Sequence, residues 1–75
     1  MVVVVFRKRF DMQWEVVKGL MESRLGRSIE VFPMAADRAV SWFWDEKERN
    51  SLITEKNLSH IGAIIASIQL WSMYS

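Results

Sequence analysis

Five consecutive residues near the start of the chain, Val2 to Phe6, are all large and apolar, and the four valines are β-branched. β-branched side chains favour an extended backbone. An unbroken apolar run, as opposed to an alternating one, is typical of a strand that is covered on both faces. The run therefore predicts such a strand, and the basic residues Arg7, Lys8 and Arg9 that follow it protect it against aggregation.

A helix is predicted after this strand, because five apolar residues recur there at helical spacing: Trp14, Val17, Leu20, Met21 and Leu25. Asp11 is expected to cap its beginning and Gly26 to take the left-handed conformation just past its end. Ser28 to Phe32 is predicted to be a second strand, in which Glu30 and Phe32 face away from Ile29 and Val31. If the two strands share a sheet, they are expected to be parallel.

Residues 33–50 allow two interpretations. In the first, 33–38 is a loop, Ala39–Trp44 is a strand, and the charged residues 45–50 turn the chain into a short strand at Ser51–Thr54. The aromatic and β-branched content of the segment favours this interpretation. In the second, 33–49 is a helix with Pro33 in its first turn. Its Met-Ala-Ala start and the spacing of Asp45 and Arg49 favour the helix.

A closing helix is predicted from Glu55 to about Tyr74, capped by Thr54 and apolar on two sides. The sequence thus predicts one compact α+β domain over residues 1–75, in the order β-α-β-β-(β)-α, with a short sheet packed by two helices. The alternative, with 33–49 helical, is β-α-β-α-α. Residues 58–75 are uncharged over a length close to that of a membrane span, but their polar residues favour a buried or interface helix.

The composition offers little for catalysis. The chain contains no cysteine and one histidine, His60, and its ten basic and nine acidic residues give a net charge of +1. We expect no metal, no cofactor and no enzymatic activity, since no nucleophile or orienting carboxylate is positioned by sequence near His60. His60 is interpreted as a surface or core residue of the closing helix. No targeting segment is evident, which predicts a cytoplasmic protein.

The aromatic residues are the most informative feature for function. Hydrophobic residues make up 51% of the chain and four are tryptophans, a surplus for so small a domain. Trp42, Phe43 and Trp44 are consecutive and cannot all share one core in a strand or in a helix. An exposed aromatic within a polar rim is typical of a binding hot spot. The predicted partner-binding residues are Trp42, Phe43, Trp44, Asp45, Glu46, Arg49 and Trp71.

These features predict a small non-enzymatic protein-binding module, such as an inhibitor, an immunity-type protein or a regulator. Its expected partner is a larger protein or a second copy in a homodimer. The alternative is a small nucleic-acid-binding or RNA-cleaving toxin-like module. The residues predicted to serve that alternative are Arg7, Lys8, Arg9, Arg24 and Arg27.

Overall fold

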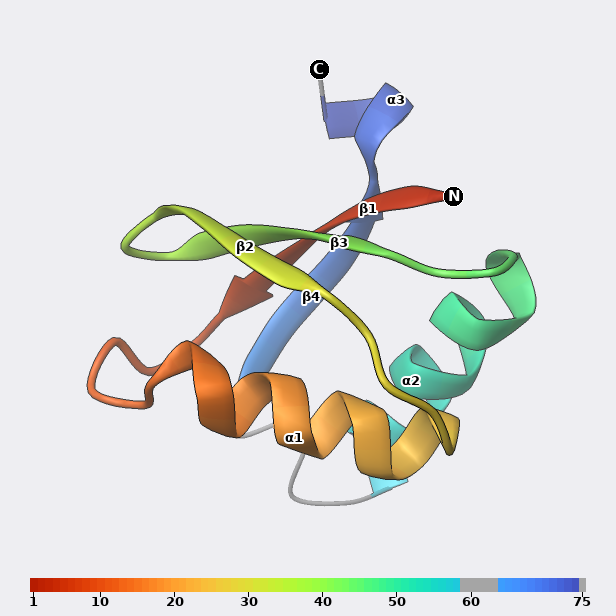
Figure 1. Ribbon diagram of the computed structural model, residues 1–75, viewed down its shortest axis with the longest axis horizontal. Helices are drawn as coiled ribbons and strands as arrows, with labels where there is room; N and C mark the ends of the chain where they lie inside the picture. Colours follow the sequence, from red (N-terminus) through yellow and green to blue (C-terminus); the bar gives the residue numbers. More distant parts are fainter. Residues whose placement is uncertain (59–63, 75) are drawn as a thin grey trace.

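A computed structural model describes residues 1–58 and 64–74 of the chain (Figure 1). The elements follow in the order β1 (Val2–Arg7), α1 (Trp14–Leu25), β2 (Val31–Ala35), β3 (Arg38–Trp42), α2 (Glu46–Leu58), β4 (Ile65–Leu70) and the short α3 (Trp71–Tyr74). The predicted α+β class is confirmed, with a four-stranded sheet and two longer helices.

The strands lie in the order β2-β3-β1-β4, and each neighbouring pair is antiparallel. Because β3 separates them, β1 and β2 run in the same direction, as the sequence predicted for two strands of one sheet. The element order and the strand order together define the split β-α-β, or ferredoxin-like, arrangement. Both α1 and α2 lie on one face of the sheet (Figure 1).

The core lies between this face and the two helices. Val3 and Val5 of β1 point into it and meet side chains of α1 and α2, among them Val17, Met21 and Leu52. Val4 points to the opposite face, yet it is as fully buried as its neighbours. The prediction of a strand buried on both faces therefore holds for Val3, Val4 and Val5, whereas Val2 and Phe6 are only half-buried and neither longer helix lies on the second face (Figure 1).

Helix α1 begins and ends close to the predicted residues. Gly26 has a φ of 73°, and its backbone N–H donates to the carbonyl of Glu22 over 2.8 Å, as expected of a left-handed cap. The prediction for Asp11 was wrong. Gln13 is the N-cap and makes no side-chain capping bond, while the Asp11 carboxylate binds Arg9 over 2.8 Å.

The helix over 33–49 is wrong, and the strand predicted at Ala39–Trp44 is confirmed as β3. The predicted loop over 33–38 is wrong for residues 33–35, which belong to β2, and β3 pairs with β2, not with residues 51–54. The second strand begins at Val31, not at Ser28, and continues through Pro33 to Ala35. A tight turn at Ala36 and Asp37 then leads into β3.

The predicted strand at Ser51–Thr54 is wrong, because these residues lie inside α2. The sequence carries a helix-start signal that fits the structure: the backbone N–H of Glu48 donates to Asp45 Oδ1 over 3.2 Å, and Glu48 Oε1 accepts the backbone N–H of Trp44 over 2.7 Å. An acidic residue followed three positions later by glutamate is a variant of the capping box. The charged segment is therefore the first turn of a helix, and Thr54, predicted as an N-cap, lies inside that helix.

The predicted closing helix over 55–74 is also wrong, because Ile65–Leu70 forms strand β4. Ile65 and Ile68 are both buried although they are three residues apart. The register explains this: Phe6 pairs with Ser67 and Arg7 with Ile65, so Ala66 forms a bulge that returns both isoleucines to the core face. The prediction for His60 falls outside the described residues.

Candidate protein interface

Six strand residues with large apolar side chains lie on the face of the sheet opposite the two longer helices. Strand pairing places them together, because residues paired across antiparallel strands share a face. Val2 pairs with Trp42, Val4 pairs with Val40, and Val40 also pairs with Phe32. We call this set the open-face patch; its members are Val2, Val4, Phe6, Phe32, Val40 and Trp42.

Two aromatic rings form the exposed part of the open-face patch. Phe32 is 54% exposed and Trp42 is 43% exposed. Their ring centroids are 5.5 Å apart at an interplanar angle of 87°, which is the favourable edge-to-face arrangement. Met34, beside Phe32 at the bulge of β2, is also exposed. Each ring thus holds the other in place while leaving a large apolar surface to solvent.

The electrostatics of this face are close to neutral. Arg38, the first residue of β3, lies over the Phe6 ring with 5.0 Å between the guanidinium carbon and the ring centroid. The same guanidinium binds both carboxylate oxygens of Asp37 over 2.8 and 2.9 Å. The hydrogen bond from Arg38 lowers the pKa of Asp37, so the carboxylate stays ionised and balances the arginine.

Trp44 belongs to a different cluster, at the beginning of α2. It is 75% exposed, and the Arg27 guanidinium lies 4.3 Å from its ring centroid. Arg27 Nε donates to Glu48 Oε2 over 2.8 Å, and this hydrogen bond lowers the pKa of Glu48. The cluster therefore ties the segment after α1 to the start of α2.

The predicted partner-binding residues do not share one surface. Trp42 lies in the open-face patch, whereas Trp44 and Asp45 lie at the start of α2. Phe43, grouped with them by sequence, is 2% exposed and belongs to the core, which corrects its assignment to the surface. The sequence predicted that at least one of these three aromatic residues is exposed, and both tryptophans confirm this prediction.

The remaining predicted residues are also dispersed. Glu46 is exposed in the first turn of α2. Arg49 Nε donates to the backbone carbonyl of Ile68 over 2.9 Å, so its guanidinium joins α2 to β4. Trp71 opens α3, which lies at the end of the sheet where β1 begins (Figure 1).

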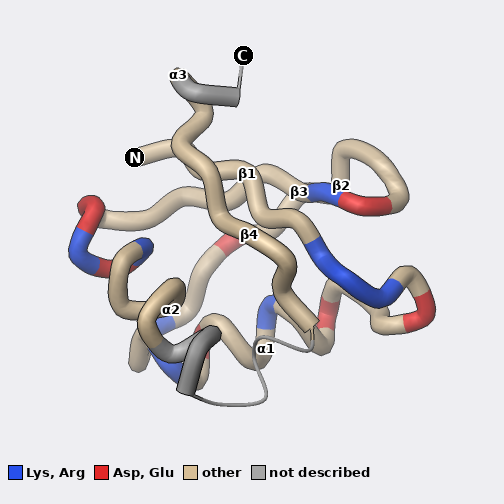
Figure 2. Tube along the Cα trace, turned by 180° about the vertical axis from the view of Figure 1, so that it is seen from behind, with Lys and Arg blue, Asp and Glu red and all other residues tan. Residues whose placement is uncertain are grey.

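The basic residues of the nucleic-acid hypothesis do not converge either. Arg7 donates to the backbone carbonyls of Ala36 and Met12, and Arg9 pairs with Asp11. Arg7 also lies 4.6 Å from the Trp14 ring at the start of α1, whereas Arg24 and Arg27 lie at its far end, about 18 Å away for a helix of twelve residues. Figure 2 shows the basic residues at separate places along the trace.

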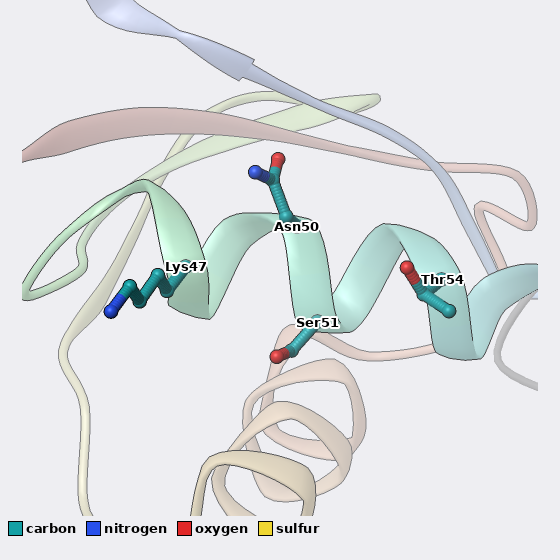
Figure 3. Close-up of a pocket in the computed structure, with 4 residues that line it drawn as sticks. All are labelled: Lys47, Asn50, Ser51 and Thr54. Atoms are coloured by element: carbon teal, nitrogen blue, oxygen red, sulfur yellow. The ribbon is translucent and has the colours of Figure 1, made fainter.

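The structure also has a shallow groove on α2, lined by Lys47, Asn50, Ser51 and Thr54. All four residues come from one helix, and in Figure 3 their side chains point in different directions, not toward one centre. Within the described part of the chain, no three histidine or acidic side chains gather in a way that would hold a metal ion. No helix found there is long and apolar enough to cross a membrane.

Fold and surface together define a small α+β domain with helices on one sheet face and a neutral aromatic patch on the other. In comparisons with known proteins, no family model, no curated protein and no solved structure matches the chain.

Sequence reasoning missed the contribution of Phe32. It placed Phe32 on the face away from the core but did not connect it with Trp42, because the register between β2 and β3 is a property of the folded sheet. The only signal available was the alternation in Ser28–Phe32, which puts a large aromatic on the side opposite Ile29 and Val31.

Proposed function

We propose that the protein is a non-enzymatic binding module of the regulatory or inhibitory kind, which docks on a protein partner through the open-face patch. The observation that carries this proposal is the exposed edge-to-face pair of Phe32 and Trp42. Apolar aromatics that are held in place and surrounded by polar residues have the properties of a binding hot spot.

The energy available from this pair is large enough for binding. Burying the exposed part of each ring, roughly 100 Å² in each case, contributes about 2–3 kcal/mol per ring. The patch is a sheet surface, not a cavity, and small ligands generally require a concave pocket that encloses them. A macromolecular surface is therefore the better match.

The nucleic-acid hypothesis has less support. A single-strand binder combines stacking aromatics with a continuous basic groove. Here the aromatic pair is accompanied by Arg38, which is balanced by Asp37, and the other basic residues are dispersed over the molecule.

The proposal is tested by capturing partner proteins from an extract of the source cells with the immobilised chain. Trp42→Ala and Phe32→Ala should each weaken binding of a captured protein by at least about thirty-fold, which corresponds to the loss of a hot spot. Trp44→Ala is the matched control, because this tryptophan is more exposed but lies off the patch. Capture that both patch variants retain at full affinity would overturn the proposal.

A further inference from the structure

We infer that the partner seated on the open-face patch is a second copy of this chain, with the two sheets packed face to face. This inference rests on the proposed function, in that it takes the open-face patch to be the docking surface. Three properties of the structure point to a second copy: the condition of the sheet edges, the charge of the patch and its area.

Both sheet edges are protected against strand addition, which is the other common way for sheets to associate. On one edge, β2 contains Pro33, which has no N–H to donate, and a bulge between Pro33 and Ala35. On the other edge, the Ile68 carbonyl of β4 accepts a hydrogen bond from Arg49, and a bulge at Ala66 interrupts the strand. These features oppose association through the sheet edges, and none of them lies on the open face.

The charge of the patch suits contact with an identical patch. In a two-fold symmetric dimer the same surface is used twice, so any net charge on it would face its own copy. The arginine on this face is neutralised by the adjacent carboxylate, since Arg38 and Asp37 form a two-pronged ion pair. An apolar, neutral surface meets its own copy without electrostatic cost, but it offers no attraction to a phosphate backbone.

The area of the patch is sufficient for a weak dimer. Phe32 and Trp42 of the patch, and Met34 beside it at the bulge of β2, are each about half exposed, leaving on the order of 100 Å² per side chain. With the half-buried Val2, Phe6 and Val40, sheet-on-sheet contact would bury on the order of 500 Å² per copy, or about 1,000 Å² in total, close to the smallest specific interfaces. We therefore expect a dissociation constant of about 1–100 μM.

The dimer would be a four-layer assembly, with the two sheets about 10 Å apart inside and the helices outside. Val40 lies in the middle of the patch because it pairs with Phe32 on one side and Val4 on the other. Trp71 and α3 lie at the end of the sheet where Val2 pairs with Trp42, which places them at the rim of the contact.

Sedimentation equilibrium of the full chain, from about 1 μM to about 1 mM, tests the inference. The wild-type chain should populate a dimer, and Trp42→Ala and Phe32→Lys should each raise the dissociation constant by at least about thirty-fold. Trp44→Ala, the matched control, should change it by less than about three-fold. Circular dichroism would establish that each variant remains folded.

A crosslinking measurement gives a second readout that does not depend on removing an aromatic ring. Because the chain contains no cysteine, Val40→Cys introduces a single thiol at the patch centre, and Ser51→Cys introduces one on the exposed side of α2. A short bismaleimide should join two copies through Cys at position 40 and leave the position 51 variant largely uncrosslinked.

The outcomes separate this inference from the proposed function. A chain that stays monomeric to about 1 mM overturns the second copy as partner, while extract capture that depends on Trp42 would leave the binding function standing. A dimer that tolerates both patch substitutions overturns the face-to-face packing, and extract capture with the same variants then decides the binding function. A monomer that binds single-stranded oligonucleotides with a steep salt dependence, lost in Trp42→Ala, would also overturn both in favour of a nucleic-acid role.

Discussion

Gly19 and Gly26 are expected to respond in opposite ways to replacement by alanine. Gly19 lies inside α1 with ordinary helical geometry, and Gly26 follows the helix with a φ of 73°. A Cβ added at either position meets no heavy atom of the surrounding structure within 4 Å, so only the local backbone conformation distinguishes the two sites. Gly19→Ala should raise the free energy of unfolding by about 0.5–1 kcal/mol, because it lowers the entropy of the unfolded chain and favours the helix.

Gly26→Ala should lower the free energy of unfolding by about 1–2 kcal/mol, because alanine in the left-handed region brings its Cβ close to the following carbonyl. Urea unfolding of both variants beside the wild-type chain measures the two effects on one scale. A stabilising Gly26→Ala, or effects of equal sign at the two glycines, would show that the helix ends elsewhere.

At the scale of the element, the beginning of α2 depends on one carboxylate. Glu48 accepts hydrogen bonds from Arg27 and from the backbone N–H of Trp44, and its side chain is largely buried. Glu48→Gln should therefore lower the free energy of unfolding by about 1–3 kcal/mol at neutral pH. Glu46→Gln is the control, because this exposed glutamate lies in the same turn and its change should stay within about 0.5 kcal/mol.

The deficit of Glu48→Gln should depend on pH. The hydrogen bond from Arg27 lowers the pKa of Glu48 in the folded chain. A lowered carboxyl pKa contributes stability that is fully present above the unfolded value, about 4.3, and is lost as the pH falls through the folded value. Urea unfolding from neutral pH to below 4 should show the wild-type and Glu48→Gln curves converging in acid; a deficit that persists unchanged there would exclude the ionised carboxylate as its cause.

Elements with strong local signals could be predicted, and those shaped by pairing could not. The valine run, α1 with its terminal Gly26 and the strand at Ala39–Trp44 follow from composition and periodicity. Strand β4 was predicted as a helix because Ile65 and Ile68 are three residues apart, which on a regular strand would place them on opposite faces. The bulge at Ala66 returns both isoleucines to the core face, and this bulge can be located only from the pairing of β4 with β1.

Helix α2 illustrates the converse case, in which a local signal was present. Residues 45–50 were interpreted as a charged turn into a short strand at Ser51–Thr54, whereas Asp45 and Glu48 form the capping pattern of a helix start. The candidate interface likewise has one part that the sequence predicts and one part that depends on strand pairing. An exposed tryptophan at position 42 could be predicted from three consecutive aromatics, but its partner Phe32 depends on the register of two strands.

At the scale of the whole molecule, the two faces of the sheet differ in how they are covered. The helices cover one face, and on the other the side chains of adjacent strands bury Val4 but leave Phe32 and Trp42 open. A chain of 75 residues buries only about 60% of its unfolded surface, so its margin of stability is small. Covering the open face would therefore add stability that the isolated chain lacks.

Because covering the open face would stabilise the folded chain, the melting temperature is expected to depend on protein concentration. If a second copy binds only the folded chain, dimer formation adds to the free energy of unfolding, by about 2.7 kcal/mol when the chain concentration is a hundred times the dissociation constant. For so small a domain, about 1 kcal/mol shifts the melting temperature by roughly 4–8 °C. Calorimetry of the wild-type chain should thus show a rise of several degrees over a hundred-fold increase in concentration. Trp42→Ala should melt at a nearly constant temperature, and its difference from the wild-type chain should narrow on dilution.

Convergence is the informative part of this measurement. A tryptophan that stabilised the monomer would lower the melting temperature of Trp42→Ala by the same amount at every concentration. A tryptophan that acts through the dimer lowers it only where the dimer is populated, because the dilute wild-type chain has already lost that contact. Trp42 lies outside the core cluster but packs on Phe32 within one copy, so a small constant offset is expected beneath a difference that grows as the dimer fills. Parallel curves would place the energetic contribution of Trp42 within one copy of the chain.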